Sequence, residues 1–275
     1  MPELPETETI ARDLDREISG RGITAVEVTR PDVLREVSPA ALEGRLTGAT
    51  IARCWRRAKL VVLDLRDGDR VVVQPRFTGA LLLSFGPLPA AEAPYSTVRL
   101  GLDDGRDLHY RDIRRLGTFS LMDEARWKAY SGRLGIEPLD REFTADHLSG
   151  LLRGSGQAVK KVLMNQRMVV GIGNIYANEA CWRAGVDPSR AARALSEREV
   201  ALLRDGIVGV LTDSIAARGT SFRDYRDASG GRGDFARSLA AYGRGGERCL
   251  RCESRLLETH AIDGRSTVLC TRCQR

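Results

Sequence analysis

The sequence contains no apolar run of the length that crosses a membrane. A spanning helix needs about 18 or more consecutive apolar residues, and no stretch of the 275 residues approaches that length. The opening residues, MPELPETETI, also lack the basic and then apolar order of a secretory signal. We therefore expect a cytoplasmic protein without a membrane partner.

Lysine is scarce in a chain that is nevertheless basic. Only four of the 43 basic residues are lysines, at Lys59, Lys128, Lys160 and Lys161. The 37 acidic residues leave a formal net charge of +6. A basic balance favours a polyanionic partner over an acidic small molecule, although an arginine-rich composition is also typical of a GC-rich genome. Charge alone leaves these two explanations equally open.

Six cysteines in 275 residues exclude a small protein that is held together by disulfides. In the cytoplasm we expect these cysteines to be reduced. Four of them form two CxxC pairs with seventeen residues between the pairs: Cys249, Cys252, Cys270 and Cys273. This spacing is typical of a four-thiolate zinc site, and the alternative is four unrelated buried cysteines. Because four thiolates leave no position for water, we predict one structural zinc per chain.

The first half of the chain shows mainly β-type patterning, and no fixed-period repeat occurs anywhere. Residues 6–19 place apolar side chains four positions apart behind Pro5, which predicts one amphipathic helix. Apolar and β-branched runs then flank Asp67-Gly68 and Asp104-Gly105. Such dipeptides between apolar runs are typical of hairpins.

The period becomes helical from about residue 141. Leucines recur at helical spacing before Gly154, and a further apolar group follows at 159–163. Ser196 and Glu199 form a capping box ahead of a helix that is predicted to end at Gly219. The sequence therefore predicts a second, helical domain.

The glycine turn at 171–174 (GIGN) lies between two helical segments. With Asn174 as N-cap, this turn would present backbone N–H groups at a helix start, which suits a phosphate. A helix turn with no ligand is the competing interpretation. Lys59, in RCWRRAK, could likewise act as a general acid or a phosphate contact, or belong to a solvated basic face.

The N-terminus carries a reactive group if Met1 is removed. Pro2 then offers a secondary amine beside the carboxyl group of Glu3. An α-amino group has a pKa near 8, so it is unprotonated at neutral pH far more often than a lysine. Such an amine can form a Schiff base with an aldehydic carbon, and Glu3 could transfer the proton that this chemistry requires.

Several motifs together resemble one family along essentially the whole chain. In order they are MPELPETET, RRAK, the segment Phe77-Thr78-Gly79, YRDIRRLG, VVGIGNIYANEA and the stretch from YGRGGERC to CTRCQR. This series closely resembles the formamidopyrimidine-DNA glycosylase and endonuclease VIII family. Leu4 and the segment 219–235 favour the formamidopyrimidine-DNA glycosylase branch.

The resemblance implies an α+β fold of two domains that clamp DNA between them. We expect an N-terminal β-sandwich flanked by helices, followed by a helical domain with a helix-two-turn-helix and a four-cysteine zinc finger. The expected divisions are a catalytic domain at 1–130, a linker at 131–140, the helix-two-turn-helix domain at 141–235 and the finger at 236–275.

The resemblance also implies residue roles. Pro2 is expected to attack C1′ of the damaged nucleotide, and Glu3 to donate the proton that assists base loss. Lys59 is expected to assist β-elimination, and Arg265 to bind phosphate and assist δ-elimination. The other expected contacts with DNA are Glu6 as a supporting residue, Phe77, Arg115 and Leu116 at the wedge, Asn174 on phosphate, and Thr220, Ser221 and Tyr225 over the everted base.

The wedge departs from the family pattern. Phe77 stands where the family usually has Met, and Leu116 where Phe is usual. Gln74-Pro75 replaces the common His-Leu, and Tyr95 lies near a position that is often His. A wedge fills the space of a flipped base, so these differences leave the preferred lesion and the opposite base open.

The function that the resemblance implies is a bifunctional glycosylase and abasic-site lyase of base excision repair. It would remove oxidised purines (formamidopyrimidine, 8-oxoguanine) through a Pro2 Schiff base and then cleave by β,δ-elimination. The expected partner is damaged double-stranded DNA, bound by a monomer at a bacterial-type nucleoid. Alternatives are a specialised member that acts on a different or bulkier lesion, and a zinc-finger protein that binds damage without cutting.

Overall fold

The computed structural model describes residues 2–220 and 226–275, which divide into two compact units. Unit 1 comprises residues 1–132 and 217–234, and unit 2 comprises 133–216 and 235–275. The sequence pattern placed 217–234 in the helical domain, whereas the structure groups this segment with the N-terminal residues. The reason is a set of hydrogen bonds to helix α1 (Leu4–Ile18), through Arg218 and Thr220.

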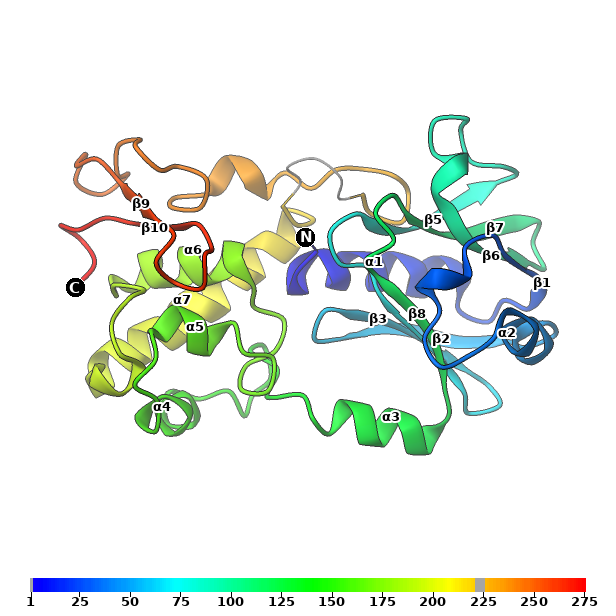
Figure 1. Ribbon diagram of the computed structural model, residues 1–275, viewed down its shortest axis with the longest axis horizontal. Helices are drawn as coiled ribbons and strands as arrows, with labels where there is room; N and C mark the ends of the chain where they lie inside the picture. The colour runs from blue at the N-terminus through cyan, green and yellow to red at the C-terminus, as the bar shows by residue number, and fades with distance from the viewer. Residues whose placement is uncertain (1, 221–225) are drawn as a thin grey trace. The chain divides into compact units, whose positions relative to one another are not determined.

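Unit 1 contains two four-stranded antiparallel sheets that share one apolar core (Figure 1). The first sheet has the order β1 (Ile23–Val28), β6 (Ser96–Leu102), β7 (Arg106–Asp112) and β5 (Gly79–Phe85). The second has the order β2 (Ile51–Arg57), β3 (Leu60–Leu65), β4 (Arg70–Gln74) and β8 (Thr118–Met122). Both predicted hairpins are present, with Val62 opposite Val72 and Leu100 opposite Leu108.

Helix α1 packs along the second sheet with the apolar face that its sequence predicts. Ile10, Leu14 and Ile18 are fully buried in the shared core. The carboxylate of Asp15 accepts a hydrogen bond of 2.7 Å from the backbone N–H of Cys54 on β2. This contact and the buried face fix the helix on the sheet, so the direction of the N-terminal residues is set by unit 1. Short helices α2 (Pro39–Leu46) and α3 (Glu124–Ser131) complete the unit.

Unit 2 is helical, with a small two-stranded finger at its end. Its helices are α4 (Ala145–Arg153), α5 (Val159–Leu163), α6 (Asn174–Ala184) and α7 (Glu197–Ala216), and its strands are β9 (Leu257–Thr259) and β10 (Thr267–Leu269). Helices α6 and α7 pack side by side (Figure 1). The capping box is confirmed, because Ser196 N–H donates to Glu199 at 2.8 Å. In the described residues, no helix is long and apolar enough to span a membrane.

Candidate functional site

The N-terminal residues Pro2 and Glu3 are buried at the start of α1. Glu3 is 2 % exposed and is the N-cap of the helix. Its backbone N–H donates to the carboxylate of Glu6 at 2.8 Å, one turn further along. Pro5 is the second helical residue. The first N–H groups of a helix have no partner within it, so a proline, which has no N–H, is favourable at this position. The backbone that carries the N-terminal amine is therefore held in one direction.

Glu6 also contacts a distant part of the chain. The backbone N–H of Thr220 donates to its other carboxylate oxygen at 2.7 Å. Glu6 is 1 % exposed and Thr220 is 4 % exposed, so the two groups meet away from bulk water. The structure thus brings together Glu3, Glu6 and Thr220. Ser221 and Tyr225, which the resemblance places with Thr220 over the everted base, lie outside the described residues.

Lys59 lies half-buried in the tight turn between β2 and β3. Ala58, just before it, has a φ of +54°, in the left-handed region that tight turns use. Arg56 braces the turn, since its guanidinium donates to the Ala58 carbonyl at 3.1 Å and to Glu8 of α1 at 2.7 Å. Although burial opposes ionisation of Glu8, the Arg56 guanidinium lowers its pKa. The lysine turn and the N-terminal helix are therefore linked by an ion pair.

The expected wedge residues lie on two neighbouring loops. Phe77 and Leu116 are unusually exposed for apolar side chains, at 46 % and 39 %. The residue before each of them, Arg76 and Arg115, has a left-handed φ of about +50°. Such backbone is strained in residues other than glycine, and strain of this kind is often found at functional sites. Both loops therefore hold a large apolar side chain outward at an energetic cost.

A buried carboxylate ties the two wedge loops together. Asp112, 1 % exposed, accepts hydrogen bonds from the Thr78 hydroxyl at 2.5 Å and from the Gly117 N–H at 2.8 Å. The Arg114 N–H closes the link by donating to the Thr78 hydroxyl at 3.0 Å. No side chain fits at Gly117, because a Cβ there would lie 2.0 Å from the Tyr110 hydroxyl. The spacing of the two loops is thus fixed from beneath.

Two arginines of the second wedge loop have partners in this structure. The Arg114 guanidinium lies 5.2 Å from the centre of the Phe77 ring, a cation–π geometry. Arg115, which the resemblance places in the DNA stack, forms an exposed ion pair with Asp32 at 2.7 Å. Exposed pairs of this kind contribute about 0 to 1 kcal/mol. Arg115 can therefore exchange this partner at little cost.

In unit 2, Asn174 lies at the beginning of α6, with one correction to its predicted place. Gly173 is the N-cap and Asn174 is the first helical residue, because the extended backbone at Gly173 already ends the preceding turn. The Asn174 amide donates to the carbonyl of Ser266 at 3.1 Å. A side-chain amide has two N–H groups, so this bond leaves capacity for a second acceptor. Arg265, the neighbour of Ser266, is exposed.

The finger turn that carries Arg265 is supported from below by a buried lysine. The ammonium group of Lys160 donates to the Ser266 carbonyl at 2.8 Å and to the Thr267 hydroxyl at 2.7 Å. Lys160 itself is fully buried. The turn between β9 and β10 contains Asp263 and Gly264, and both residues have positive φ. Asn174 and Arg265 are thus brought to one side of unit 2.

The four cysteines meet as their spacing predicts. The Sγ atoms of Cys249, Cys252, Cys270 and Cys273 all lie within 4.8 Å of one another. Zinc-to-sulfur bonds of about 2.3 Å in a tetrahedron place sulfurs about 3.8 Å apart, so this cluster fits a single zinc ion. Hydrogen bonds with Ser254 lower the pKa of Cys252 to about 6, whereas contact with Cys252 raises the pKa of Cys273, so without a metal ion the cluster ionises unevenly.

Sequence reasoning missed three buried polar residues that hold these groups. Asp112 and Lys160 are described above, and Glu179 of α6 accepts three consecutive backbone N–H groups, from Ala240, Ala241 and Tyr242, at 2.8 to 2.9 Å. Burial raises the pKa of Glu179 despite these donors. The sequence around Asp112, HYRDIRR, is largely charged, so nothing local marks that position, and the charge of Glu179 within YANEACW is the one signal of this kind among the three residues.

Comparison with known proteins gives matches along the whole chain. Three family models match: the formamidopyrimidine-DNA glycosylase N-terminal domain at residues 1–119, its H2TH domain at 134–226, and the zinc finger found in FPG and IleRS at 246–275. These matches define a DNA glycosylase fold with a zinc-finger domain.

Individual relatives are similar over their full lengths. The formamidopyrimidine-DNA glycosylase of Carboxydothermus hydrogenoformans is 41 % identical over 277 residues, with 100 % of both chains covered. The Lactococcus lactis Fpg bound to DNA with N7-benzyl-Fapy-dG has 31 % identity, 100 % coverage of both chains and a TM-score of 0.91. The Thermus thermophilus MutM (Fpg) protein has 31 % identity and a TM-score of 0.87, with 99 % and 98 % covered. The chain belongs to the formamidopyrimidine-DNA glycosylase family.

Proposed function

We propose that this protein is a bifunctional enzyme of base excision repair, a DNA glycosylase and abasic-site lyase that removes oxidised purines from duplex DNA. The observation that carries the proposal is the geometry of the N-terminus. Glu3 follows Pro2 at a buried helix start, and the Glu6 carboxylate holds the Glu3 backbone. A secondary amine in that position, with a carboxyl group next to it, is equipped for Schiff-base chemistry.

The reaction proceeds through a covalent bond between enzyme and sugar. After Met1 is removed, the Pro2 nitrogen attacks C1′ of the damaged nucleotide and gives up its proton, and the base leaves with the electron pair of the glycosidic bond and takes up a proton. Glu3 then donates a proton to the ring oxygen as the bond from C1′ to that oxygen breaks, which leaves an iminium ion between Pro2 and C1′. This ion acidifies C2′, so loss of a C2′ proton expels the 3′ phosphate by β-elimination, and loss of the C4′ proton then expels the 5′ phosphate by δ-elimination. Water then hydrolyses the iminium ion and returns the free amine.

Basic and amide groups from both units bind the phosphates. In unit 1, Lys59 is held at a braced turn, and we assign it to the phosphate near the reacting sugar and to β-elimination. In unit 2, Asn174 at the start of α6 and the exposed Arg265 bind phosphate, and Arg265 assists δ-elimination. Thr220, with Ser221 and Tyr225, contacts the everted base. Helix starts and arginines are both suited to phosphate because they present N–H donors.

We assign one structural zinc ion per chain to the four-cysteine cluster. The distances among the sulfurs support this assignment, and four thiolates leave no position for substrate. Zinc would supply no chemistry of its own, and it would hold the short hairpin of β9 and β10 in place. Arg265 lies on the turn of that hairpin, so metal binding supports the phosphate contact.

The substrate partner is damaged double-stranded DNA, bound by one copy of the chain at the nucleoid. Several solved relatives support this partner, since the Lactococcus lactis Fpg has been seen with Fapy-dG DNA and with abasic-site DNA. The basic net charge agrees with a polyanion. For each chain we expect one lesion, one reacting amine and one zinc ion.

A panel of duplexes tests the proposal. The substrates are one duplex each with formamidopyrimidine, 8-oxoguanine, an oxidised pyrimidine and an abasic site. We expect release of both oxidised purines and strand cleavage at the abasic site. Glu3→Gln should nearly abolish excision of an intact base and affect a preformed abasic site less. Binding without cleavage on every substrate would favour the damage-binding alternative and contradict the proposal.

The exposed wedge residues favour a second candidate function, a specialised enzyme of the same family that acts on a different or bulkier lesion. Phe77 and Leu116 replace the usual Met and Phe, and both side chains are accessible. The same panel distinguishes this candidate, because a specialised enzyme would prefer a bulkier lesion to 8-oxoguanine. The catalytic amine and Glu3 serve either substrate range.

A further inference from the structure

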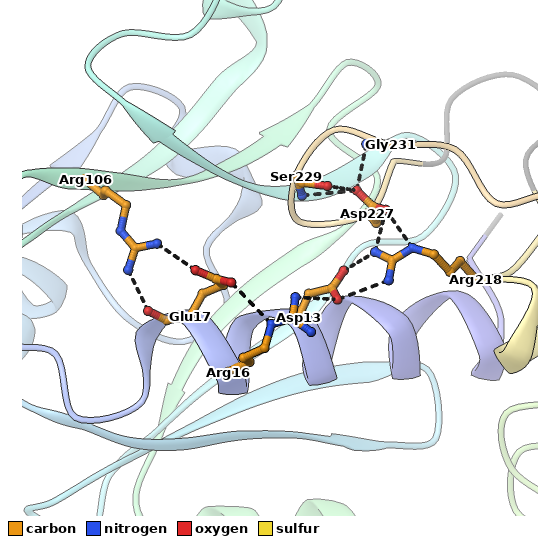
Figure 2. Close-up of polar contacts among 8 residues, drawn as sticks. All are labelled: Asp13, Arg16, Glu17, Arg106, Arg218, Asp227, Ser229 and Gly231. Carbon is orange, nitrogen blue, oxygen red and sulfur yellow. Dashed lines mark hydrogen bonds and ion pairs between the residues drawn. The ribbon is translucent and has the colours of Figure 1, made fainter.

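One guanidinium bridges two buried carboxylates on the side of α1 that meets residues 217–234 (Figure 2). Arg218 donates to Asp13 of α1 at 2.5 Å and to Asp227 at 2.6 Å, both through Nη2. Its Nη1 and Nε add longer contacts of 3.3 and 3.2 Å to the same two partners. Asp13 and Asp227 are 5 % and 3 % exposed. We call these three residues the Arg218 clamp.

The clamp fixes a second turn through Asp227. The other carboxylate oxygen of Asp227 accepts from the N–H of Gly231 at 2.7 Å, and from the N–H and hydroxyl of Ser229 at 3.1 and 2.8 Å. Burial opposes ionisation of this carboxyl group, but Arg218 keeps its pKa below the ordinary value. Every oxygen of the two carboxylates is thereby in contact with Arg218 or with the turn it supports.

Arg218 adopts an unfavourable backbone to reach this position. Its φ is +59°, in the left-handed region that costs non-glycine residues free energy. The Arg218 side chain is 46 % exposed, whereas the two acids that it pairs with are buried. Such a pair adds little net stability, because water screens the guanidinium and desolvation of the acids offsets the attraction. A strained residue that holds two buried acids is therefore poorly explained by stability alone, and fixing the position of the adjoining chain is a role that such networks serve in other proteins.

The adjoining chain leads directly to the N-terminus. Two residues after Arg218, the Thr220 N–H donates to Glu6, and Glu6 in turn accepts from the Glu3 N–H. Asp13 and Glu6 are seven residues apart on α1, which is two helical turns, so they share one face. The clamp and the Thr220 bond thus hold the segment 218–220 to the same side of the helix.

We propose that Arg218 is a positioning residue for the N-terminal amine. By bridging Asp13 and Asp227 it keeps the Thr220 N–H in place, which holds the Glu6 carboxylate in the orientation that fixes the Glu3 backbone and so the direction of Pro2. Arg218 touches neither DNA nor the reacting atoms in this scheme. The proposal rests on the proposed function for its kinetic consequence, but its structural consequence can be measured without any reaction.

The test uses Arg218→Ala and Arg218→Lys, with Arg16→Ala as the matched control. Arg16 also contacts Asp13, at 3.3 Å, but its side chain is 67 % exposed and lies on α1 itself. Arg218→Lys keeps the charge but loses the planar fork that bridges two carboxylates. The full chain is used, and the unfolding temperature of each variant is recorded so that all rates are compared among folded proteins.

The first measurement is amide hydrogen exchange and amide chemical shift at Thr220 and Glu3, by NMR of the DNA-free protein. We expect both Arg218 variants to speed exchange at both amides by about tenfold or more, since a hydrogen bond is lost at each. Arg16→Ala should leave them unchanged. Unchanged exchange at Glu3 in the Arg218 variants would overturn the proposal, whatever the enzyme does.

The second measurement is the single-turnover rate of borohydride trapping on an abasic duplex. Small displacements of reacting groups cost up to about a hundredfold in rate, and we expect Arg218→Ala to slow trapping by about tenfold or more, with its affinity for the duplex preserved. A rate loss confined to intact lesions would overturn the proposal, because it would exclude action through Glu6. If the wild-type chain forms no trapped complex, the proposed function fails, and the exchange data alone decide the clamp.

Discussion

The Asp112 carboxylate and the Thr78 hydroxyl are 34 residues apart in the chain, and they meet in a buried hydrogen bond of 2.5 Å. This bond joins the loop that presents Phe77 to the loop that presents Leu116. Both wedge side chains are partly exposed, and the Phe77 ring lies against the Arg114 guanidinium rather than in the core. The relative position of the two wedge residues therefore depends on a polar contact beneath them.

Thr78→Val tests this dependence, because valine keeps the shape and removes the hydroxyl. It leaves an oxygen of Asp112 and the Arg114 N–H without this partner, and an unsatisfied buried polar group costs about 1 to 3 kcal/mol. We expect the free energy of unfolding in urea to fall by that amount. Excision of 8-oxoguanine should slow more than cleavage of an abasic site, which needs no base extruded. Equal slowing of both reactions would show that the hydrogen bond from Thr78 to Asp112 stabilises the fold without positioning the wedge.

Phe77→Ala should reduce lesion excision more than Leu116→Ala does. Stacking of a base on an aromatic face is worth about 1 to 3 kcal/mol, and of the two exposed residues only Phe77 has such a face. Both variants should still cleave abasic duplexes. Single-turnover rates on 8-oxoguanine opposite each of the four bases provide the comparison.

Leu116→Phe supplies the reciprocal change. An aromatic ring at this position should narrow the tolerance for the opposite base towards the pattern of the family. A harmless Phe77→Ala together with an unchanged opposite-base profile in Leu116→Phe would show that Phe77 does not supply the stacking surface that the family usually has at position 116.

Arg265→Ala should weaken DNA binding and lower the salt dependence of the binding constant by about one unit, the effect of one phosphate contact. Arg248→Ala is the matched control, since Arg248 lies in the same finger with its side chain 82 % exposed.

Removal of zinc by a chelator should lower the affinity for DNA at least as much as Arg265→Ala does. Metal analysis of protein purified without chelators should find one zinc per chain, and a metal-free protein that binds DNA normally would contradict the assignment.

The capping box of α7 predicts a dependence of stability on pH. The hydrogen bond from Arg190, with further bonds from Ser196, lowers the pKa of Glu199 from 4.5 to about 2. Because the folded pKa is the lower one, the stabilisation is complete above 4.5 and is lost as pH falls from 4.5 towards 2. Glu199→Gln should therefore cost about 0.5 to 1 kcal/mol at neutral pH. Urea unfolding should show this difference shrinking across that acid range, and a difference that grows on acidification would refute the assignment.

The sequence predicts the elements that carry a local signal. The apolar residues of helix α1 repeat at helical spacing, and the hairpins of β3 with β4 and β6 with β7 are predicted because apolar and β-branched runs flank an Asp-Gly dipeptide. Strand β1 is not, since it is half-exposed and carries little apolar pattern. Helix α1 begins two residues before its predicted start, because Glu3 rather than Pro5 marks the boundary.

The site is predictable only where a motif is local. The two CxxC pairs bring their own ligands together, and the N-terminal block fixes its own helix start. Asp112, Lys160 and Arg218 each have a partner that is distant in sequence, and no spacing rule indicates those contacts. The distant partners are Thr78, Ser266 and Asp13. These contacts form only when distant segments of the chain meet in the folded protein, and a local sequence pattern does not show which segments meet.

The most direct test of the proposed mechanism is the identity of the residue that becomes covalently bound to DNA. The protein is incubated with an abasic duplex and borohydride, and the trapped complex is digested and mapped by mass spectrometry. We predict that the sugar is attached to the nitrogen of Pro2, in a protein whose Met1 has been removed. Attachment at Lys59 alone, or an N-terminus that retains Met1 in active protein, would contradict the mechanism.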